Sequence, residues 1–218
     1  MNRTWILASV WASLTVVSAG AAWAQQAADS HEQHKMAANA GQDPHAAHRA
    51  AMNKPRYTVK DAEYDVPDVE LLDESGAQVS LRAFLASERP VALNFIFTTC
   101  TTICPVMTVT FAQMQRELGD AADKVQLVSV SIDPEYDRPD VLKAYAEQFH
   151  AGANWTFLTG DSNDIAQVLR SFDSYTGSKM NHQPLTLLKK PGSPSWVRID
   201  GLANGESLAQ EVTARLLN

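Results

Sequence analysis

The fold of this chain is decided by one stretch of sequence, Phe97-Thr98-Thr99-Cys100-Thr101-Thr102-Ile103-Cys104-Pro105. The apolar run Val91–Phe97 leads into it and predicts a buried strand. Pro105 predicts the first residue of a helix, where its missing N–H is not needed. Both sulfurs are therefore expected at a helix N-terminus, whose dipole and free N–H groups favour thiolate over thiol. Disulfide oxidoreductases use this arrangement with two residues between the cysteines. The additional residue here changes the predicted chemistry from electron exchange to metal capture.

Residues 1–24 have the pattern of a secretory signal peptide. Arg3 supplies the positive charge, Trp5–Val17 is almost wholly apolar, and Ala22-Trp23-Ala24 matches a small-x-small cleavage site. The apolar run is short for a membrane span, so cleavage after Ala24 is expected, with a membrane-anchored form as the alternative. The mature protein is expected to be exported, and a bacterial periplasm is the simplest compartment.

Charge and cysteine content narrow the function classes. The chain has 25 acidic and 18 basic residues and a formal charge of −7, with no basic stripe, which argues against a nucleic-acid partner. An oxidising compartment allows a structural disulfide between Cys100 and Cys104. Such a bridge would close a very short loop. Cross-linking a short loop stabilises a folded protein least, so a structural role for the disulfide is disfavoured.

Residues 25–54 are predicted to be a disordered tail. They are rich in Ala, Gln and His and have too few large apolar residues to offset the entropy of ordering. Two similar clusters lie within the tail: His31, His34 and Met36, and then His45, His48 and Met52. Imidazole and thioether are both copper ligands, so the tail is expected to scavenge metal, with a plain polar linker as the alternative.

Residues 55–218 are predicted to form one α/β domain. The expected strands are 69–72, 78–81, 91–97, 125–131, 155–158, 185–189 and 196–199, and the expected helices are 105–118, 139–150, 162–172 and 206–217, with Ser162 as a helix cap. This order is a thioredoxin-like fold with an added N-terminal β-hairpin and an inserted strand–helix. In such sheets the chemistry lies at the carboxyl ends of the strands, where the cysteines occur.

Two thiolates and one imidazole make a ligand set suited to Cu(I), which prefers soft sulfur. The predicted domain offers two histidines. His150 ends a helix, where a surface position is expected. His182 lies in a polar loop just before a strand that should pack near the cysteines. From the residues alone, His182 can be either solvated or a ligand.

The segment Phe97–Thr108 resembles the CxxxCP copper-site motif of the Sco/SenC family, which are exported copper chaperones tied to cytochrome oxidase assembly. The segment Val128–Pro139 is similar to that family's strand-to-loop segment, which ends in Asp-Pro. The order of the remaining elements also matches, so the resemblance covers most of residues 57–218.

This resemblance implies that Cys100, Cys104 and His182 are the copper ligands. Family members usually have an acidic residue before the histidine and a small hydroxyl residue after it, whereas this chain has Asn181 and Gln183. The loss of a nearby carboxylate should make the imidazole less basic and change its surroundings. Copper affinity and choice of partner are therefore expected to differ from the family pattern.

The leading expectation is a periplasmic metallochaperone and not an enzyme. It would hold copper as Cu(I), with Cu(II) also open, and deliver it to a copper-accepting subunit such as the dinuclear copper centre of cytochrome c oxidase. Uptake needs reduced thiols, which implies a periplasmic thiol reductase as a second partner. The alternatives are a thiol–disulfide oxidoreductase that reduces the recipient's cysteines, and a thiol peroxidase.

Overall fold

The structure, a computed structural model, describes residues 56–218. The predicted signal peptide and the two His/Met clusters lie outside these residues. No helix in the described part has the length and apolar character that crossing a membrane would require.

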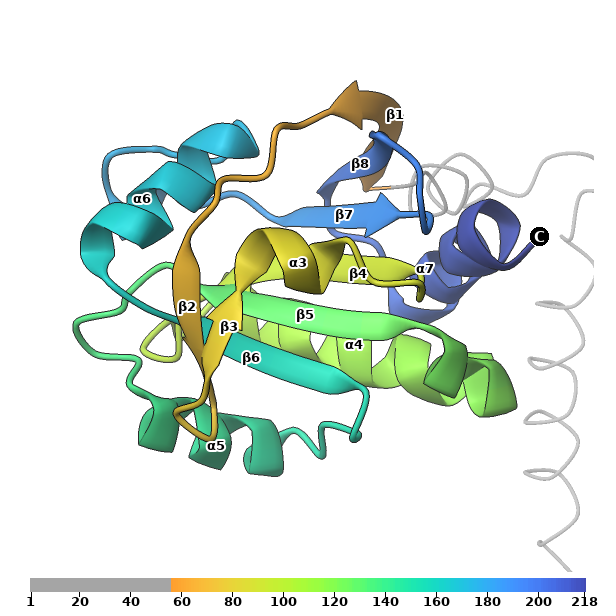
Figure 1. Cartoon of the computed structure of the whole chain (residues 1–218). Coiled ribbons are helices and arrows are strands. Elements are labelled where there is room, and N and C mark those ends of the chain that lie inside the picture. Colours follow the sequence, from red (N-terminus) through yellow and green to blue (C-terminus); the bar gives the residue numbers. More distant parts are fainter. Residues whose placement is uncertain (1–55) are drawn as a thin grey trace, which may run out of the picture. The chain divides into compact units, whose positions relative to one another are not determined.

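One sheet of eight strands forms the centre of the domain (Figure 1), in the order β1-β8-β7-β4-β5-β6-β2-β3. The strands are β1 (Tyr57–Glu63), β2 (Glu70–Asp73), β3 (Gln78–Ser80), β4 (Val91–Ile96), β5 (Gln126–Ser131), β6 (Trp155–Thr159), β7 (Leu185–Lys189) and β8 (Ser195–Gly201). Strands β4, β5 and β6 run parallel, and the other pairings are antiparallel. The fold is therefore a mixed α/β sheet with a parallel centre, and the cysteine stretch follows one of its central strands.

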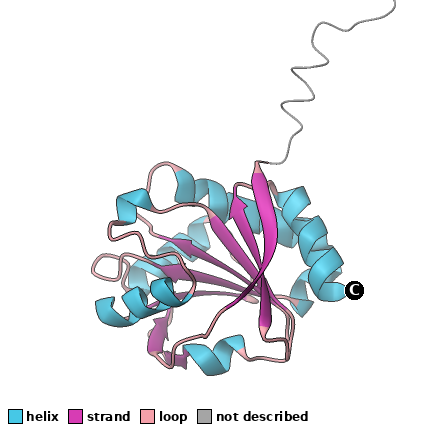
Figure 2. Ribbon diagram, turned by 90° about the horizontal axis from the view of Figure 1, so that it is seen from above, coloured by secondary structure: helices cyan, strands magenta, loops and turns pink. Residues whose placement is uncertain are grey.

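Helices cover both faces of the sheet (Figure 2). They are α3 (Leu81–Leu85), α4 (Ile103–Leu118), α5 (Pro139–Gln148), α6 (Ser162–Ser171) and α7 (Gly205–Val212), with the short helical turns η1 (Gly119–Lys124), η2 (Lys179–Asn181) and η3 (Thr213–Leu217). Apolar residues of α4, α5 and α7 form one core cluster with the sheet, and those of α3 and α6 form the other.

The buried strand β4 shows why the sheet carries two cores. All six of its residues are buried, and successive side chains point to opposite faces. Ala92 and Ile96 pack under α4, while Leu93 and Phe95 pack on the other face. A strand buried on both sides is rigid, so its carboxyl end is a firm support for the loop that carries Cys100.

The structure confirms the predicted hairpin of β2 and β3, in which Leu71 pairs with Val79, and the predicted hairpin of β7 and β8. The sequence pattern does not predict β1, which pairs along its whole length with β8, or the short helix α3. Strand β1 was missed because it carries mostly polar residues and only part of its length is shielded from solvent.

Several helix boundaries differ from the prediction. Helix α4 begins at Ile103, so Pro105 is its third residue and not its first; the N–H groups of the whole first turn lack helical partners, so proline is tolerated there too. The cap of α6 is Asp161, whose side chain accepts from the N–H of Asn163, and Ser162 is the first helical residue. Helix α5 ends at Gln148, two residues before His150.

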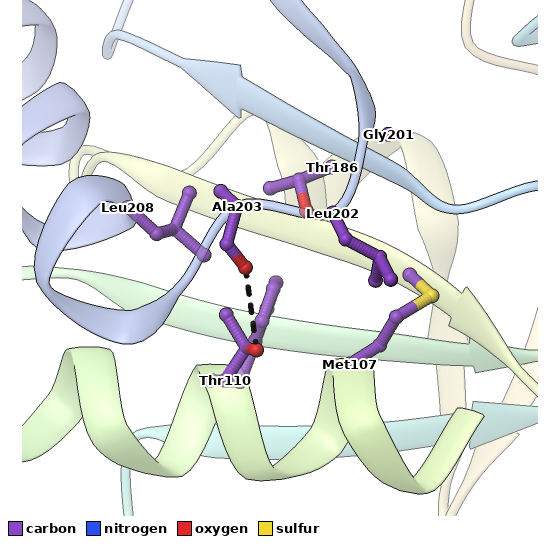
Figure 3. Close-up of a pocket in the computed structure, with 8 residues that line it drawn as sticks. Met107, Thr110, Thr186, Gly201, Leu202, Ala203 and Leu208 are labelled. Atoms are coloured by element: carbon purple, nitrogen blue, oxygen red, sulfur yellow. Dashed lines mark hydrogen bonds between the residues drawn. The ribbon is translucent and has the colours of Figure 1, made fainter. Parts of the chain in front are cut away.

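One face of α4, which includes Met107 and Thr110, packs against the segment after β8 (Figure 3). The hydroxyl of Thr110 donates to the carbonyl of Ala203 at 3.4 Å, beside Met107 and Leu208. The pocket between them has a volume of about 10 Å³, room for about one water molecule. This face of α4 therefore fixes the helix in place and is too small to take a ligand.

Candidate metal centre

The two cysteines lie where β4 gives way to α4. Strands β4 and β5 are parallel and in register, with Ile96 beside Ser131, so the loops that follow them share one edge of the sheet. Cys100 lies in the loop before α4, and Cys104 is the second residue of the helix. The backbone N–H of Cys104 donates to the sulfur of Cys100 at 3.4 Å. The N–H groups at the N-terminus of α4 are thus directed at the sulfur of Cys100.

The thiol of Cys100 is activated by its neighbours. Burial opposes its ionisation, but hydrogen bonds from the backbone N–H groups of Cys104 and Thr102 and from the Thr102 hydroxyl outweigh that effect. Together they lower the pKa of Cys100 to about 7. A large fraction of Cys100 is therefore thiolate near neutral pH, as the sequence predicts.

Cys104 behaves in the opposite way. It has no exposed surface, and burial raises its pKa to about 12, with further increases from the nearby Cys100 sulfur and the negative charge of Asp137. A hydrogen bond from the backbone of Phe97 only partly opposes this. The prediction that both sulfurs favour the thiolate is thus correct for Cys100 and wrong for Cys104, because desolvation outweighs the helix terminus.

His182 is buried and held in one orientation. It is 7% exposed, and its Nε2 lies 2.9 Å from the backbone carbonyl of Phe95. A carbonyl oxygen can only accept, so Nε2 carries the proton and Nδ1 keeps a free lone pair. Burial lowers the pKa of His182, against a smaller rise from the Phe95 hydrogen bond. The imidazole is therefore neutral at physiological pH, which is the form that binds a metal.

The alternative of a solvated His182 is therefore wrong. The other histidine of the domain, His150, is exposed and lies just beyond α5 with a positive φ of 54°. Its predicted surface position is confirmed. The same burial that the sequence could not reveal makes His182 a structural residue as well as a candidate ligand.

Cys100 and His182 line one pocket, with a volume of about 340 Å³, that we call the cysteine–histidine pocket. Its walls are Phe97, Thr99, Cys100, Thr101, Thr102, Ile103, Lys179, Met180, His182, Gln183 and Pro184. Cys104 is not part of this lining. Both cysteines are free thiols, and among residues 56–218 no three His, Cys, Asp or Glu side chains are arranged so that they could hold a metal ion together. The structure thus brings two of the three predicted ligands into one pocket and leaves Cys104 behind it.

A family model described as SCO1/SenC matches residues 59–216, which is most of the chain. The chain belongs to the SCO1/SenC family. The SCO1 protein homolog of Bacillus subtilis is 38% identical over 112 residues, which cover 50% of this chain and 57% of that protein. The chain spans about half the length of the curated relatives it matches.

Solved structures of the family share the fold. BsSco, described as a member of the Sco family of cytochrome c oxidase assembly proteins with a disulfide switch, is 29% identical with a TM-score of 0.60. The match covers 71% of this chain and 95% of that one. Bradyrhizobium japonicum ScoI, solved with copper bound, has a TM-score of 0.53 and covers 71% of this chain and 98% of its own. At 24% identity this second likeness concerns the fold alone.

In this SCO1/SenC protein, the loop after β5 joins the cysteine loop to the histidine loop. The carboxylate of Asp137 is fully buried and accepts hydrogen bonds from the N–H and hydroxyl of Thr98 and from Ser131, the last at 2.6 Å. Asp133 forms an ion pair with Lys179 and accepts from Thr99. Two carboxylates therefore hold both halves of the site.

Sequence reasoning noted the stretch around Asp133 and Asp137 only as part of a resemblance and missed its role. The available signal was its position, since both carboxylates follow a parallel strand at the same sheet edge as Cys100. Lys179 carried no comparable signal, because its partner Asp133 is 46 residues away.

Replacing Asp137 by alanine is expected to lower the free energy of unfolding by about 2 to 3 kcal/mol. The change leaves the half-buried N–H and hydroxyl of Thr98 and the buried hydroxyl of Ser131 without their acceptor, and hydrogen bonds to charged groups are among the stronger ones. Urea unfolding measures the loss. The control is Asp140→Ala, since Asp140 is 72% exposed and its removal should change stability by less than about 0.5 kcal/mol. Equal stability of the two variants would contradict the role given to Asp137.

Thiol alkylation should separate the two cysteines. The rate at Cys100 is expected to rise with pH through a midpoint of about 7, because the reactive form is the thiolate. Cys104 should stay unmodified in the folded protein because it is buried and keeps its proton. Mass spectrometry after pulses of iodoacetamide at several pH values checks this, with unfolded protein as the control in which both cysteines react. Modification of Cys104 first would show that the asymmetry is assigned the wrong way round.

Proposed function

We propose that this protein is a copper chaperone. It binds Cu(I) through the thiolates of Cys100 and Cys104 and the imidazole of His182, and delivers it to a copper-accepting subunit of a respiratory oxidase, with the dinuclear copper centre of cytochrome c oxidase as the recipient. The observation that supports this most directly is the pocket that joins an activated thiol to a neutral, oriented imidazole. Cu(II) is a second oxidation state that this ligand set can serve.

The donor set fits copper by its chemistry. Cu(I) favours thiolate sulfur and accepts imidazole, while carboxylate-rich sites suit harder ions. Cys104 joins the set only after it loses its proton, so metal uptake releases a proton and becomes stronger as pH rises. Membership of the SCO1/SenC family is consistent with this role.

The proposal also places the protein in an exported compartment. Residues 1–24 serve as a signal peptide cleaved after Ala24, and the His/Met clusters of residues 25–54 collect copper for the main site. A periplasmic thiol reductase keeps Cys100 and Cys104 reduced. We also assign the β2–β3 hairpin and a strand–helix unit as additions to a thioredoxin-like core. Copper stoichiometry of the mature chain with and without residues 25–54 tests the tail, which should raise it above one equivalent.

A second function, thiol–disulfide exchange with the recipient, is favoured by the asymmetry of the cysteines. The Cys100 thiolate attacks a disulfide sulfur of the recipient, which forms a mixed disulfide and releases one recipient thiolate. Cys104 then loses its proton and attacks the Cys100 sulfur, which releases the second recipient thiolate and leaves a Cys100–Cys104 disulfide. A low-pKa thiol that lines the pocket and a fully buried partner behind it suit these two steps.

Deletion of the gene separates the two functions. A copper chaperone predicts loss of oxidase activity that added copper restores, whereas a reductase predicts loss that added reductant restores. The His182→Ala variant sharpens the comparison, because it should fail to restore copper delivery yet keep thiol exchange. Unchanged oxidase activity in the deletion strain, with and without copper limitation, would overturn both.

A further inference from the structure

We propose that Met180 is a copper ligand of this chain. Its thioether, with Cys100 and His182, forms a capture set in the cysteine–histidine pocket that holds an incoming Cu(I) ion before Cys104 joins. This inference rests on the proposed copper function and adds a ligand and an order of events to it.

The first observation is where Met180 lies. Its exposed fraction is 77%, whereas Met107 and Met114 of α4 are 4% and 0% exposed. Single exposed apolar residues are common and carry no meaning by themselves. Met180, however, lines the same pocket as Cys100 and His182. Its side chain is therefore largely exposed at the place where a soft ligand is useful.

The second observation is that the backbone around Met180 is held in position. The N–H of Met180 donates to the Ser178 hydroxyl at 3.3 Å, and the N–H of His182 donates to the Lys179 carbonyl at 3.2 Å. Lys179 is itself paired with Asp133. These contacts keep Met180 and His182 on one short turn beside Cys100, which lowers the entropy that ligand binding must remove.

The third observation is that Cys104 is not accessible from the pocket. It is fully buried and absent from the pocket lining, so an ion that enters from solvent meets Cys100, Met180 and His182 first. Thiolate, thioether and imidazole together suit Cu(I). Cys104 then releases its proton to solvent, and its sulfur replaces the Met180 thioether on the ion. Copper stays Cu(I) throughout, so no electron donor or acceptor is needed.

The test uses the reduced mature chain with Cys104→Ser, which removes the final ligand and keeps the capture set. Anaerobic competition with a chromophoric Cu(I) chelator compares this protein with the Cys104→Ser/Met180→Leu double variant. Leucine keeps the size and apolar character of methionine but lacks sulfur. We expect the double variant to bind Cu(I) about 10- to 100-fold more weakly. X-ray absorption at one copper per chain should count two sulfur neighbours in the first protein and one in the second.

The control is Met114→Leu in the same Cys104→Ser background, which removes a buried thioether outside the pocket and should leave affinity unchanged. The tail has copper ligands of its own, so all three proteins are also compared without residues 25–54, where bound copper reports the pocket. Equal affinity with and without the Met180 sulfur overturns the role of Met180, as does a Cys104→Ser protein that binds no Cu(I). If wild-type reduced protein binds no Cu(I), the proposed function fails together with this inference; wild-type binding with no effect of Met180→Leu removes the inference alone.

Discussion

Replacement of Cys100 by serine is expected to weaken Cu(I) binding by more than about 100-fold, since even groups that only support metal ligands cost 10- to 100-fold when removed. Cys100 is the one sulfur that is both activated and open to the pocket, so it takes part in capture and in the final site. Competition with a chromophoric chelator under anaerobic conditions measures the loss, and the reference is otherwise unchanged protein without residues 25–54, which should bind one copper per chain.

The Cys104→Ser variant is the matched comparison. It should also lose tight binding, because one thiolate leaves too few soft ligands, but it keeps the weaker capture set of Cys100, His182 and Met180. We therefore expect a smaller loss than for Cys100→Ser. If Cys104→Ser keeps near-wild-type affinity, the two-thiolate site is wrong.

Replacement of His182 by alanine should have two effects. Cu(I) affinity is expected to fall by about 10- to 100-fold, because the imidazole is the only nitrogen ligand of the proposed site. The free energy of unfolding should also fall by about 1 to 3 kcal/mol, because the carbonyl of Phe95 loses its hydrogen-bond donor in a buried setting. His182 is buried, so its replacement removes packing as well as coordination.

The same two measurements on His150→Ala provide the control. His150 is exposed, so neither copper affinity nor urea stability should change appreciably. A larger loss of copper affinity for His150→Ala than for His182→Ala would show that the wrong histidine is assigned. Loss of stability without loss of affinity at His182 would leave it as a packing residue only.

The central part of the fold could be predicted because its signals are local. The apolar run before Cys100, the proline at position 105 and the turn between β7 and β8 each mark an element within a few residues. Strand β1 and helix α3 could not be found this way. β1 is defined by its partner β8, more than 130 residues later, and α3 is too short to show a helical period.

The candidate site likewise has features with local sequence signals, which could be predicted, and features that depend on long-range contacts, which could not. The sequence identified Cys100, Cys104 and His182, but not which sulfur would be ionised or which nitrogen of the histidine would be free. Those properties come from contacts between distant residues, such as His182 with Phe95, and from the depth at which Cys104 is buried. Burial and long-range partners are properties of the packed chain, and no single stretch of sequence contains them.

The two aspartates after β5 have a consequence for transplanting this site. The stretch from Phe97 to Pro105 is short enough to graft into another protein of similar fold, and it contains both cysteines. Its shape, however, is set by Asp137, which holds Thr98, and its distance from the histidine is set by Asp133 and Lys179. A graft of the cysteine stretch alone would carry the sulfurs without their scaffold. A working transplant has to move three separate pieces of chain together, so the smallest portable unit is the trio of loops.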